Sequence, residues 1–90
     1  MAKDTTETIH RDIPQPAWQQ LAAILRGRIR AGRYQPGHAI PSESACEREF
    51  GVSRGTCRKA LAQLRSEGLV VTVAGRGSYV TDPLPEEDES

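Results

Sequence analysis

The sequence predicts a mainly α fold, in which a three-helix bundle is followed by a small two-stranded β-hairpin. Apolar residues recur at helical spacing up to Gly68, after which two short β-branched runs flank a glycine-rich turn. The chain has 90 residues, of which 37% are hydrophobic and 4% aromatic, so it can bury one modest core of aliphatic side chains. This size excludes a large multidomain enzyme.

The first helix is expected to begin at Pro16 and to end before Gly32. Its apolar residues lie at i, i+3, i+4, i+7 and i+11, on one stripe made of Trp18, Leu21, Ala22, Leu25 and Ile29. Residues 1–15 are polar and lack apolar periodicity, so we expect them to form a flexible N-terminal arm. After the helix, a Pro-Gly turn precedes residues 39–40, a segment long enough for a minimal strand.

Two further helices are expected to be joined by a tight turn. Ser42 is placed to cap a helix that runs to Phe50, and Ser53 is placed to cap a helix that runs to about Glu67. The sequence Gly-Val-Ser at 51–53 separates them, which is the length and chemistry of a helix-turn-helix. The third helix is expected to pack its own apolar stripe inward, at Cys57, Ala60, Leu61 and Leu64.

A β-hairpin is expected to follow the third helix. Residues 69–73 and 78–81 are rich in β-branched side chains, and the glycine-rich tip at 74–77 carries one cation, Arg76. Helix, helix-turn-helix and hairpin in this order make a winged helix-turn-helix domain, which we expect over residues 16–81.

The net charge of zero hides an uneven distribution of charge along the chain. Residues 13–81 carry ten basic and four acidic side chains, a net charge of +6, and ten of the twelve cations of the chain are arginine. The guanidinium group suits phosphate oxygens and guanine edges, so this composition favours a nucleic-acid partner. Residues 82–90 carry five acidic and no basic side chains, and we expect a disordered acidic tail that could compete with DNA for the arginines.

Three segments follow one another through these elements: PAWQQLAAILRGRIRAGRYQPGHAIPSE, FGVSRGTCRKAL and EGLVVTVAGRGSYV. Their order and spacing across residues 16–81 resemble the DNA-binding domain of the GntR family of bacterial transcription regulators. The resemblance implies that the chain is a transcription regulator and that its partner is double-stranded DNA, bound sequence-specifically. It also implies that the third helix, residues 54–67, enters the major groove, and that the wing, residues 74–77, reaches the minor groove or the backbone.

Most candidate DNA contacts lie at the start of the third helix. Because the apolar stripe faces the core, Arg54, Arg58 and Lys59 are directed outward. Arg54 and Arg58 are expected to read guanine through its O6 and N7 atoms, and Thr56 is expected to contact a phosphate or a thymine methyl group. The resemblance places Gly55 beside them.

Further candidate contacts lie at the helix caps and on the wing. Ser42 and Ser53, besides capping helices, suit phosphate oxygens. Arg76 is expected to reach the minor groove or its phosphates, and Tyr79 is expected to donate to a phosphate. Two glycines beside Arg76 would allow close approach of the backbone to DNA, Gly75 and Gly77.

Cys46 and Cys57 stand where the resemblance implies that the second and third helices pack together. The family usually has larger aliphatic or β-branched residues at these positions. We expect two small buried hydrophobic side chains in a reducing cytosol, and we keep as the alternative a reversible disulfide, a redox pair that would lock the two helices. The cysteines show no zinc-ligand spacing with the histidines, and no metal or cofactor is expected.

Functions other than DNA binding have less support in the sequence. It contains no nucleophile–base constellation and no phosphate-binding loop, so we do not expect an enzyme. The alternative is a winged-helix adapter that binds other proteins in a regulatory complex. Without a signal peptide or a long apolar run, the chain is expected to be cytoplasmic in bacteria, associated with the nucleoid and not with a membrane.

Members of the family normally continue into a domain that binds a small-molecule effector and forms the dimer. Nine residues follow the wing here and cannot form a ligand pocket, so we expect no effector to bind this chain. The methionine start and the tail favour a stand-alone DNA-binding module over a fragment. A homodimer would then form through the domain itself, through the arm or by two copies binding side by side on DNA. The alternative is a dimer with a partner protein.

Overall fold

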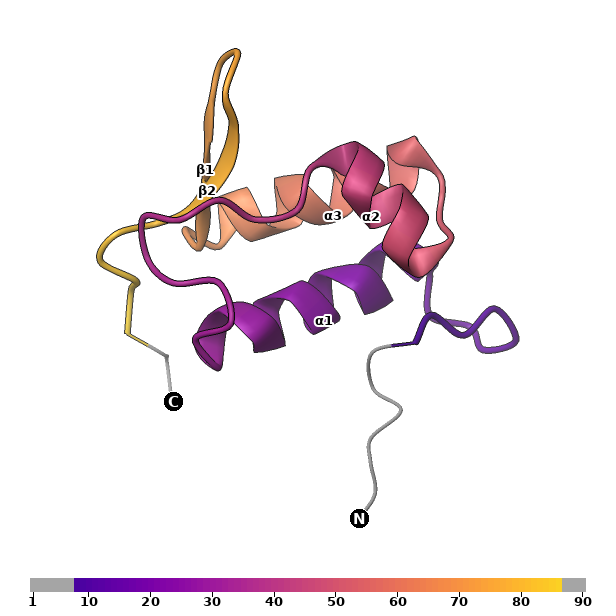
Figure 1. Ribbon diagram of the computed structural model, residues 1–90. Helices are drawn as coiled ribbons and strands as arrows, with labels where there is room; N and C mark the ends of the chain where they lie inside the picture. The colour runs from indigo at the N-terminus through magenta and orange to yellow at the C-terminus, as the bar shows by residue number, and fades with distance from the viewer. Residues whose placement is uncertain (1–7, 87–90) are drawn as a thin grey trace.

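The computed structural model of the chain describes residues 8–86, which contain three helices and one two-stranded antiparallel sheet (Figure 1). The helices are α1 (Ala17–Arg30), α2 (Glu43–Phe50) and α3 (Arg54–Ser66), and the strands are β1 (Val70–Val73) and β2 (Gly77–Val80). α1 and α3 lie one above the other, α2 lies near the start of α3, and the hairpin projects beyond the end of α3 (Figure 1). The predicted order of elements is confirmed.

The core lies between α1 and α3. It contains the predicted apolar stripes of both helices, except that Trp18 is half-buried, and the base of the hairpin closes it with Leu69, Val70 and Val80. α2 contributes one fully buried side chain, Cys46. Most of α2 therefore stays near the surface, where its carboxylates are available to the side chains of α3.

The predicted helix ends agree with the structure to within one or two residues. Ser42 Oγ accepts a hydrogen bond from the Ala45 amide, and Ser53 Oγ accepts one from the Thr56 amide, each at 3.1 Å. Gly51 follows α2 with a φ of 67°, a left-handed conformation that glycine adopts without steric cost. The turn between α2 and α3 therefore forms where the spacing predicted it.

The hairpin has the register that places Thr72 opposite Ser78, and residues 74–76 form its loop. β1 begins one residue later than predicted, and β2 begins and ends one residue earlier. The minimal strand expected before α2 is a single bridge between Ala39 and Tyr79. This bridge ties the base of the wing to the segment that leads into α2.

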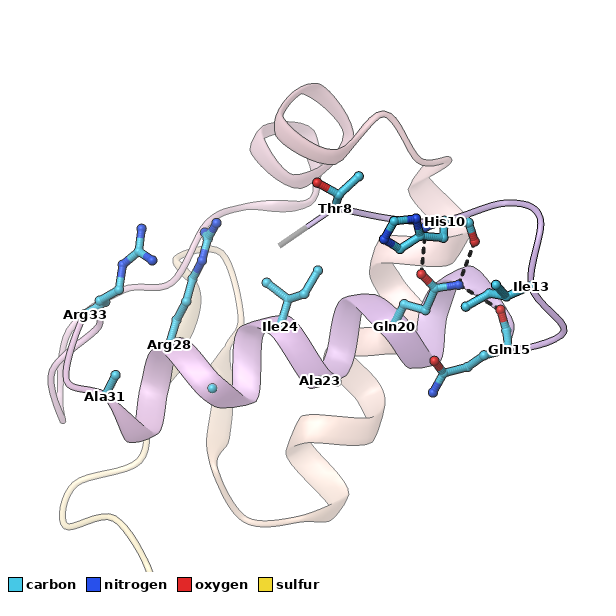
Figure 2. Close-up of a pocket in the computed structure, with 11 residues that line it drawn as sticks. Thr8, His10, Ile13, Gln15, Gln20, Ala23, Ile24, Arg28, Ala31 and Arg33 are labelled. Atoms are coloured by element: carbon cyan, nitrogen blue, oxygen red, sulfur yellow. Dashed lines mark hydrogen bonds between the residues drawn. The ribbon is translucent and has the colours of Figure 1, made fainter. Parts of the chain in front are cut away.

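Residues 8–15 lie against α1, and the expectation of a flexible arm stays a prediction. The buried side chain of Gln20 accepts a hydrogen bond from the His10 amide and donates to the His10 and Gln15 carbonyls, at 2.8–2.9 Å (Figure 2). One buried amide thus satisfies three backbone groups, a pairing that sequence periodicity does not reveal. Residues 1–7 of the expected arm lie outside the described residues.

The start of the expected acidic tail, residues 82–86, also contacts the domain. Leu84 packs against the core, and Arg30 Nη1 donates to the Pro85 carbonyl at 2.7 Å. One apolar side chain among the acidic ones thus packs on the core, and the disorder of the tail stays a prediction. Residues 87–90 lie outside the described residues.

Candidate nucleic-acid interface

A groove of about 360 Å³ separates the exposed face of α3 from the N-terminal end of α2 and from the wing. Four of its lining residues were predicted to contact DNA, namely Ser42, Arg54, Arg58 and Gly77. The other lining residues are Pro41, Glu43, Ser44, Leu61, Arg65, Thr72 and Ser78. The groove joins the helix-turn-helix and the wing into one continuous surface.

α3 brings Arg54 and Arg58 to one face because they are four residues apart. Arg65, seven residues after Arg58, extends the same row towards the wing. The buried residues of α3 lie on the neighbouring face, so this row of cations faces solvent. The side chains of Arg54 and Arg58 are 56% and 63% exposed, which leaves both accessible to a ligand in the groove.

Carboxylates of α2 lie against both of these arginines. Arg58 donates from Nε to Glu43 Oε2 and from Nη2 to Glu43 Oε1, each at 3.2 Å. Arg54 Nη2 lies 3.6 Å from Glu47 Oε1 and 3.4 Å from Ser44 Oγ. The hydrogen bonds with Arg58 lower the pKa of Glu43, and the same bonds raise the pKa of Arg58. Both groups are therefore charged at neutral pH.

Neither Glu43 nor Glu47 was expected at the interface from the sequence. Helical periodicity identifies the outward face of α3, but the residues of α2 that lie opposite it depend on how the two helices cross. Exposed ion pairs of this kind are weak, so they do not prevent the arginines from binding a base or a phosphate.

The hydroxyl groups at the start of α3 are engaged in the helix cap. Ser53 Oγ accepts from the Thr56 amide and lies 2.9 Å from Thr56 Oγ1. Gly55 is exposed, and Ser53 Oγ is the nearest atom that a side chain added there would meet, at 3.9 Å. These three residues adjoin Arg54 in the chain but lie outside the lining of the groove.

Lys59 and Tyr79 lie away from the groove. Lys59 Nζ is 5.0 Å from the centroid of the Trp18 ring, a cation–π contact with α1. Tyr79 lies opposite Val71 in the hairpin, so its side chain is on the other face of the wing from Ser78, which lines the groove. The structure therefore does not bring these two residues together with the paired arginines.

Arg76 lies at the tip of the wing between Gly75 and Gly77. Its amide donates to the Val73 carbonyl at 2.9 Å and closes the loop of the hairpin. Gly75 and Gly77 have φ values of 77° and 124°, which other residues rarely adopt. The hairpin projects from the helices (Figure 1). Gly77 lines the groove, whereas Arg76 is not one of its lining residues.

Three polar side chains that were not predicted link α3 to the wing. Arg65 Nη1 donates to Thr72 Oγ1 at 3.1 Å, and Thr72 Oγ1 lies 3.1 Å from Ser78 Oγ. The spacing of Arg65 from Arg58 was a usable signal in the sequence. Thr72 lies near Ser78 because the two residues are paired across the hairpin. This pairing could not be predicted from the sequence.

Cys46 and Cys57 meet where α2 packs on α3, and both are free and fully buried. Burial raises the pKa of Cys46 to about 12 and also raises the pKa of Cys57. The thiolate is the reactive form of cysteine, so these surroundings favour two small hydrophobic side chains. The redox pair stays a prediction.

A larger hollow, of about 550 Å³, lies between residues 8–15 and α1 and shares no lining residue with the groove (Figure 2). Within residues 8–86, no three His, Cys, Asp or Glu side chains are grouped so as to hold a metal ion. Across the same residues, no helix combines the length and the apolar character that a membrane span requires.

Known proteins match the part of the chain that contains the helix-turn-helix and the wing. The family profile described as "Bacterial regulatory proteins, gntR family" matches residues 17–80. The mannosyl-D-glycerate transport/metabolism system repressor MngR of Escherichia coli (strain K12) is 43% identical over 68 residues, which are 76% of this chain and 28% of that protein. The HTH-type transcriptional repressor NagR of Bacillus subtilis (strain 168) is 38% identical over 79 residues, 88% of this chain and 32% of that protein.

Both of these relatives are named as repressors, and the chain spans about three tenths of their length. Among solved structures, the DNA-binding domain of AraR in complex with operator ORR3 superposes with a TM-score of 0.74 at 35% identity. The match covers 80% of this chain and 87% of that one. The chain therefore belongs to the GntR family of bacterial regulatory proteins and carries its winged helix-turn-helix domain.

Proposed function

We propose that the chain binds double-stranded DNA sequence-specifically and thereby regulates transcription. The observation that carries this proposal is the exposed pair Arg54 and Arg58, side by side on the first turns of α3 in a groove between α2 and the wing. An α-helix fits the major groove of B-DNA, and a guanidinium group donates two hydrogen bonds to guanine O6 and N7. The crystallisation of the similar AraR domain with an operator supports the same function.

In this proposal α3 lies in the major groove, where Arg54 and Arg58 read bases. Phosphates are contacted from the helix starts and their neighbours, by Ser42, Ser53, Gly55, Thr56 and Lys59. The wing, residues 74–77, reaches the minor groove or its backbone through Gly75, Arg76 and Gly77, with Tyr79 as a further phosphate donor. Lys59 must leave the Trp18 ring to take part.

Selection of bound sequences from random DNA tests this function. The protein should enrich one sequence, and its affinity should fall steeply as the salt concentration rises, because binding releases counterions from the phosphates. The double variant Arg54→Ala, Arg58→Ala should lose the preference for that sequence. The control Arg48→Ala removes an exposed cation of α2 that lies outside the groove. This variant should keep the preference for the selected sequence.

The opposite result would point to the protein-binding adapter. If no sequence is enriched, or if the double variant binds the selected DNA as well as the unchanged protein does, the regulator function is contradicted.

We also propose that two copies bind one DNA site. One domain offers a small contact surface, and two copies related by a two-fold axis would read the two halves of a palindrome. The selected sequences should then be palindromic, and the mass of the complex should correspond to two chains on one duplex. One chain on an asymmetric site would contradict this stoichiometry. The proposal places the protein at bacterial DNA in the cytoplasm, with no effector bound by this domain.

A further inference from the structure

The ion pair between Glu43 and Arg58 leaves one edge of the guanidinium group open. Arg58 uses Nε and Nη2 to reach the two oxygens of Glu43, both at 3.2 Å. A guanidinium group has five N–H donors, so both donors of Nη1 and the second donor of Nη2 remain. One donor of Nη1 and the free donor of Nη2 form the outer edge of the group, and these two donors can pair with O6 and N7 of one guanine.

The backbone position of Glu43 is fixed independently of Arg58. Glu43 is the first residue of α2, directly after the capping residue Ser42, whose Oγ accepts the Ala45 amide at 3.1 Å. Glu43 is also negatively charged at the positive end of the helix dipole, a position that favours the carboxylate. A long flexible side chain from α3 is thus paired with the carboxylate of a residue whose backbone position is set by the cap of α2.

We propose that Glu43 is a positioning residue for DNA recognition, which holds Arg58 side-on so that the outer edge of its guanidinium group is presented to a guanine. This proposal rests on the proposed function, since it takes Arg58 as a reader of bases. Holding the side chain in advance reduces the rotamer freedom that it loses on binding. The negative charge of Glu43 also disfavours a phosphate in the same place, so it opposes binding in a wrong register.

Two other arginines, Arg54 and Arg26, also lie beside glutamates. Arg54 lies 4.0 Å from Glu43 and 3.6 Å from Glu47, without the paired contact that Arg58 makes. Arg26 and Glu67 form the same side-on geometry, with Nε to Oε1 at 2.7 Å and Nη2 to Oε2 at 2.6 Å. That pair joins α1 to the end of α3 outside the groove, so it provides a matched control.

The test measures base preference, using the sequence selected by the unchanged protein. Binding is compared between that sequence, a set of duplexes in which each guanine is replaced in turn, and random DNA, at one salt concentration. Arg58→Ala should lose about 5- to 150-fold preference for guanine at one position, the range expected for one bidentate contact. Glu43→Gln should lose about 3- to 10-fold at that same position and at no other, while its affinity for random DNA stays equal or rises.

Two further variants separate position from charge and from folding. Glu43→Asp keeps the charge but shortens the side chain, so it should keep weak binding to random DNA and still lose part of the guanine preference. Glu67→Gln breaks the ion pair with Arg26 outside the groove and should leave the guanine preference unchanged. A Glu43→Gln change made in the Arg58→Ala background should have no further effect on base preference. If Glu43→Gln fails to fold, as melting curves would show, Glu43→Asp carries the test.

The outcomes distinguish the inference from the function on which it rests. If Glu43→Gln strengthens binding to every duplex equally and the guanine preference stays intact, Glu43 is a competing carboxylate and the proposal is overturned. If Arg58→Ala changes no base preference while the double variant with Arg54→Ala does, the regulator function stands and the positioning role falls. If the unchanged protein shows no base preference, the proposed function itself fails.

Discussion

At the scale of single residues, Cys46 and Cys57 show how burial decides the chemistry of a side chain. Both thiols are fully buried and have raised pKa values. Since the thiolate is the reactive form, we expect neither cysteine to react with a thiol reagent in the native protein at pH 7–8, and both to react after denaturation. A count of free thiols in the two conditions checks this.

The same count decides the alternative function of the cysteine pair. After mild treatment with hydrogen peroxide, two free thiols should still be found on denaturation. Their disappearance, together with a mass lower by two hydrogens, would contradict this expectation and establish a disulfide between α2 and α3.

The arginines of α3 and the carboxylates of α2 also differ in how far the sequence could predict them. Arg54 and Arg58 were identifiable because the apolar period of their own helix fixes which side chains face outward. Glu43 was not identifiable as their partner, because fifteen residues and a helix crossing separate it from Arg58. Gln20 is a similar case, since its side chain is buried by the contacts that it makes with distant backbone groups.

At the scale of elements, the capping residue Ser53 supports the start of α3. Ser53→Ala removes the acceptor of the Thr56 amide, so it should lower the free energy of unfolding by about 1 kcal/mol, which corresponds to about 4–8 °C in the melting temperature of a domain of this size. Thermal unfolding measures the change. Ser66→Ala, in the last turn of the same helix, removes an exposed hydroxyl that only donates to the Gln63 carbonyl, and it should have a smaller effect. Equal losses in the two variants would contradict the capping role.

The packing of α1 against α3 is supported by a partly exposed ion pair. The hydrogen bonds from Arg26 lower the pKa of Glu67 below its ordinary value of 4.5. The stabilisation from a carboxylate with a lowered pKa is present above that ordinary value and is lost as the pH falls through the lowered one. Glu67→Gln should therefore reduce the free energy of unfolding by about 0.5–1 kcal/mol at pH 7 and by much less at pH 3. Unfolding curves at both pH values check this, and a difference independent of pH would count against it.

The elements themselves were predictable because local signals agree with one another. Serine caps, the Gly-Val-Ser turn and the change from helical to alternating periodicity each placed a boundary to within one or two residues. The segments at 8–15 and 82–86 were expected to be loose because their composition is polar. The structure packs them through a few apolar side chains, Ile9 and Leu84, whose partners lie far away in the sequence.

At the scale of the whole molecule, the domain and the C-terminal end of the chain carry opposite net charges, positive over residues 13–81 and negative over residues 82–90. We expect the acidic end to lower affinity for DNA of any sequence at low salt, because it neutralises part of the field of the arginines. Changing its last four acidic residues to amides, while keeping Leu84, should raise the affinity for random DNA by about 2- to 10-fold at low salt and by less at high salt, where charges are screened. These residues are Glu86, Glu87, Asp88 and Glu89. Unchanged affinity for random DNA at low salt would show that the acidic residues do not weaken DNA binding.

Guanidinium groups of α3 are proposed to read guanines from the major groove, and base analogues in the DNA distinguish this groove from the minor groove. In the selected duplex, 7-deazaguanine removes the N7 acceptor in the major groove, whereas inosine removes the amino group in the minor groove. We predict that 7-deazaguanine at one or two positions weakens binding by about 5-fold or more, that inosine there has a much smaller effect, and that Arg58→Ala or Arg54→Ala abolishes the sensitivity to 7-deazaguanine. Binding that responds to inosine at these positions and not to 7-deazaguanine would show that the guanines are read from the minor groove and not by α3 in the major groove.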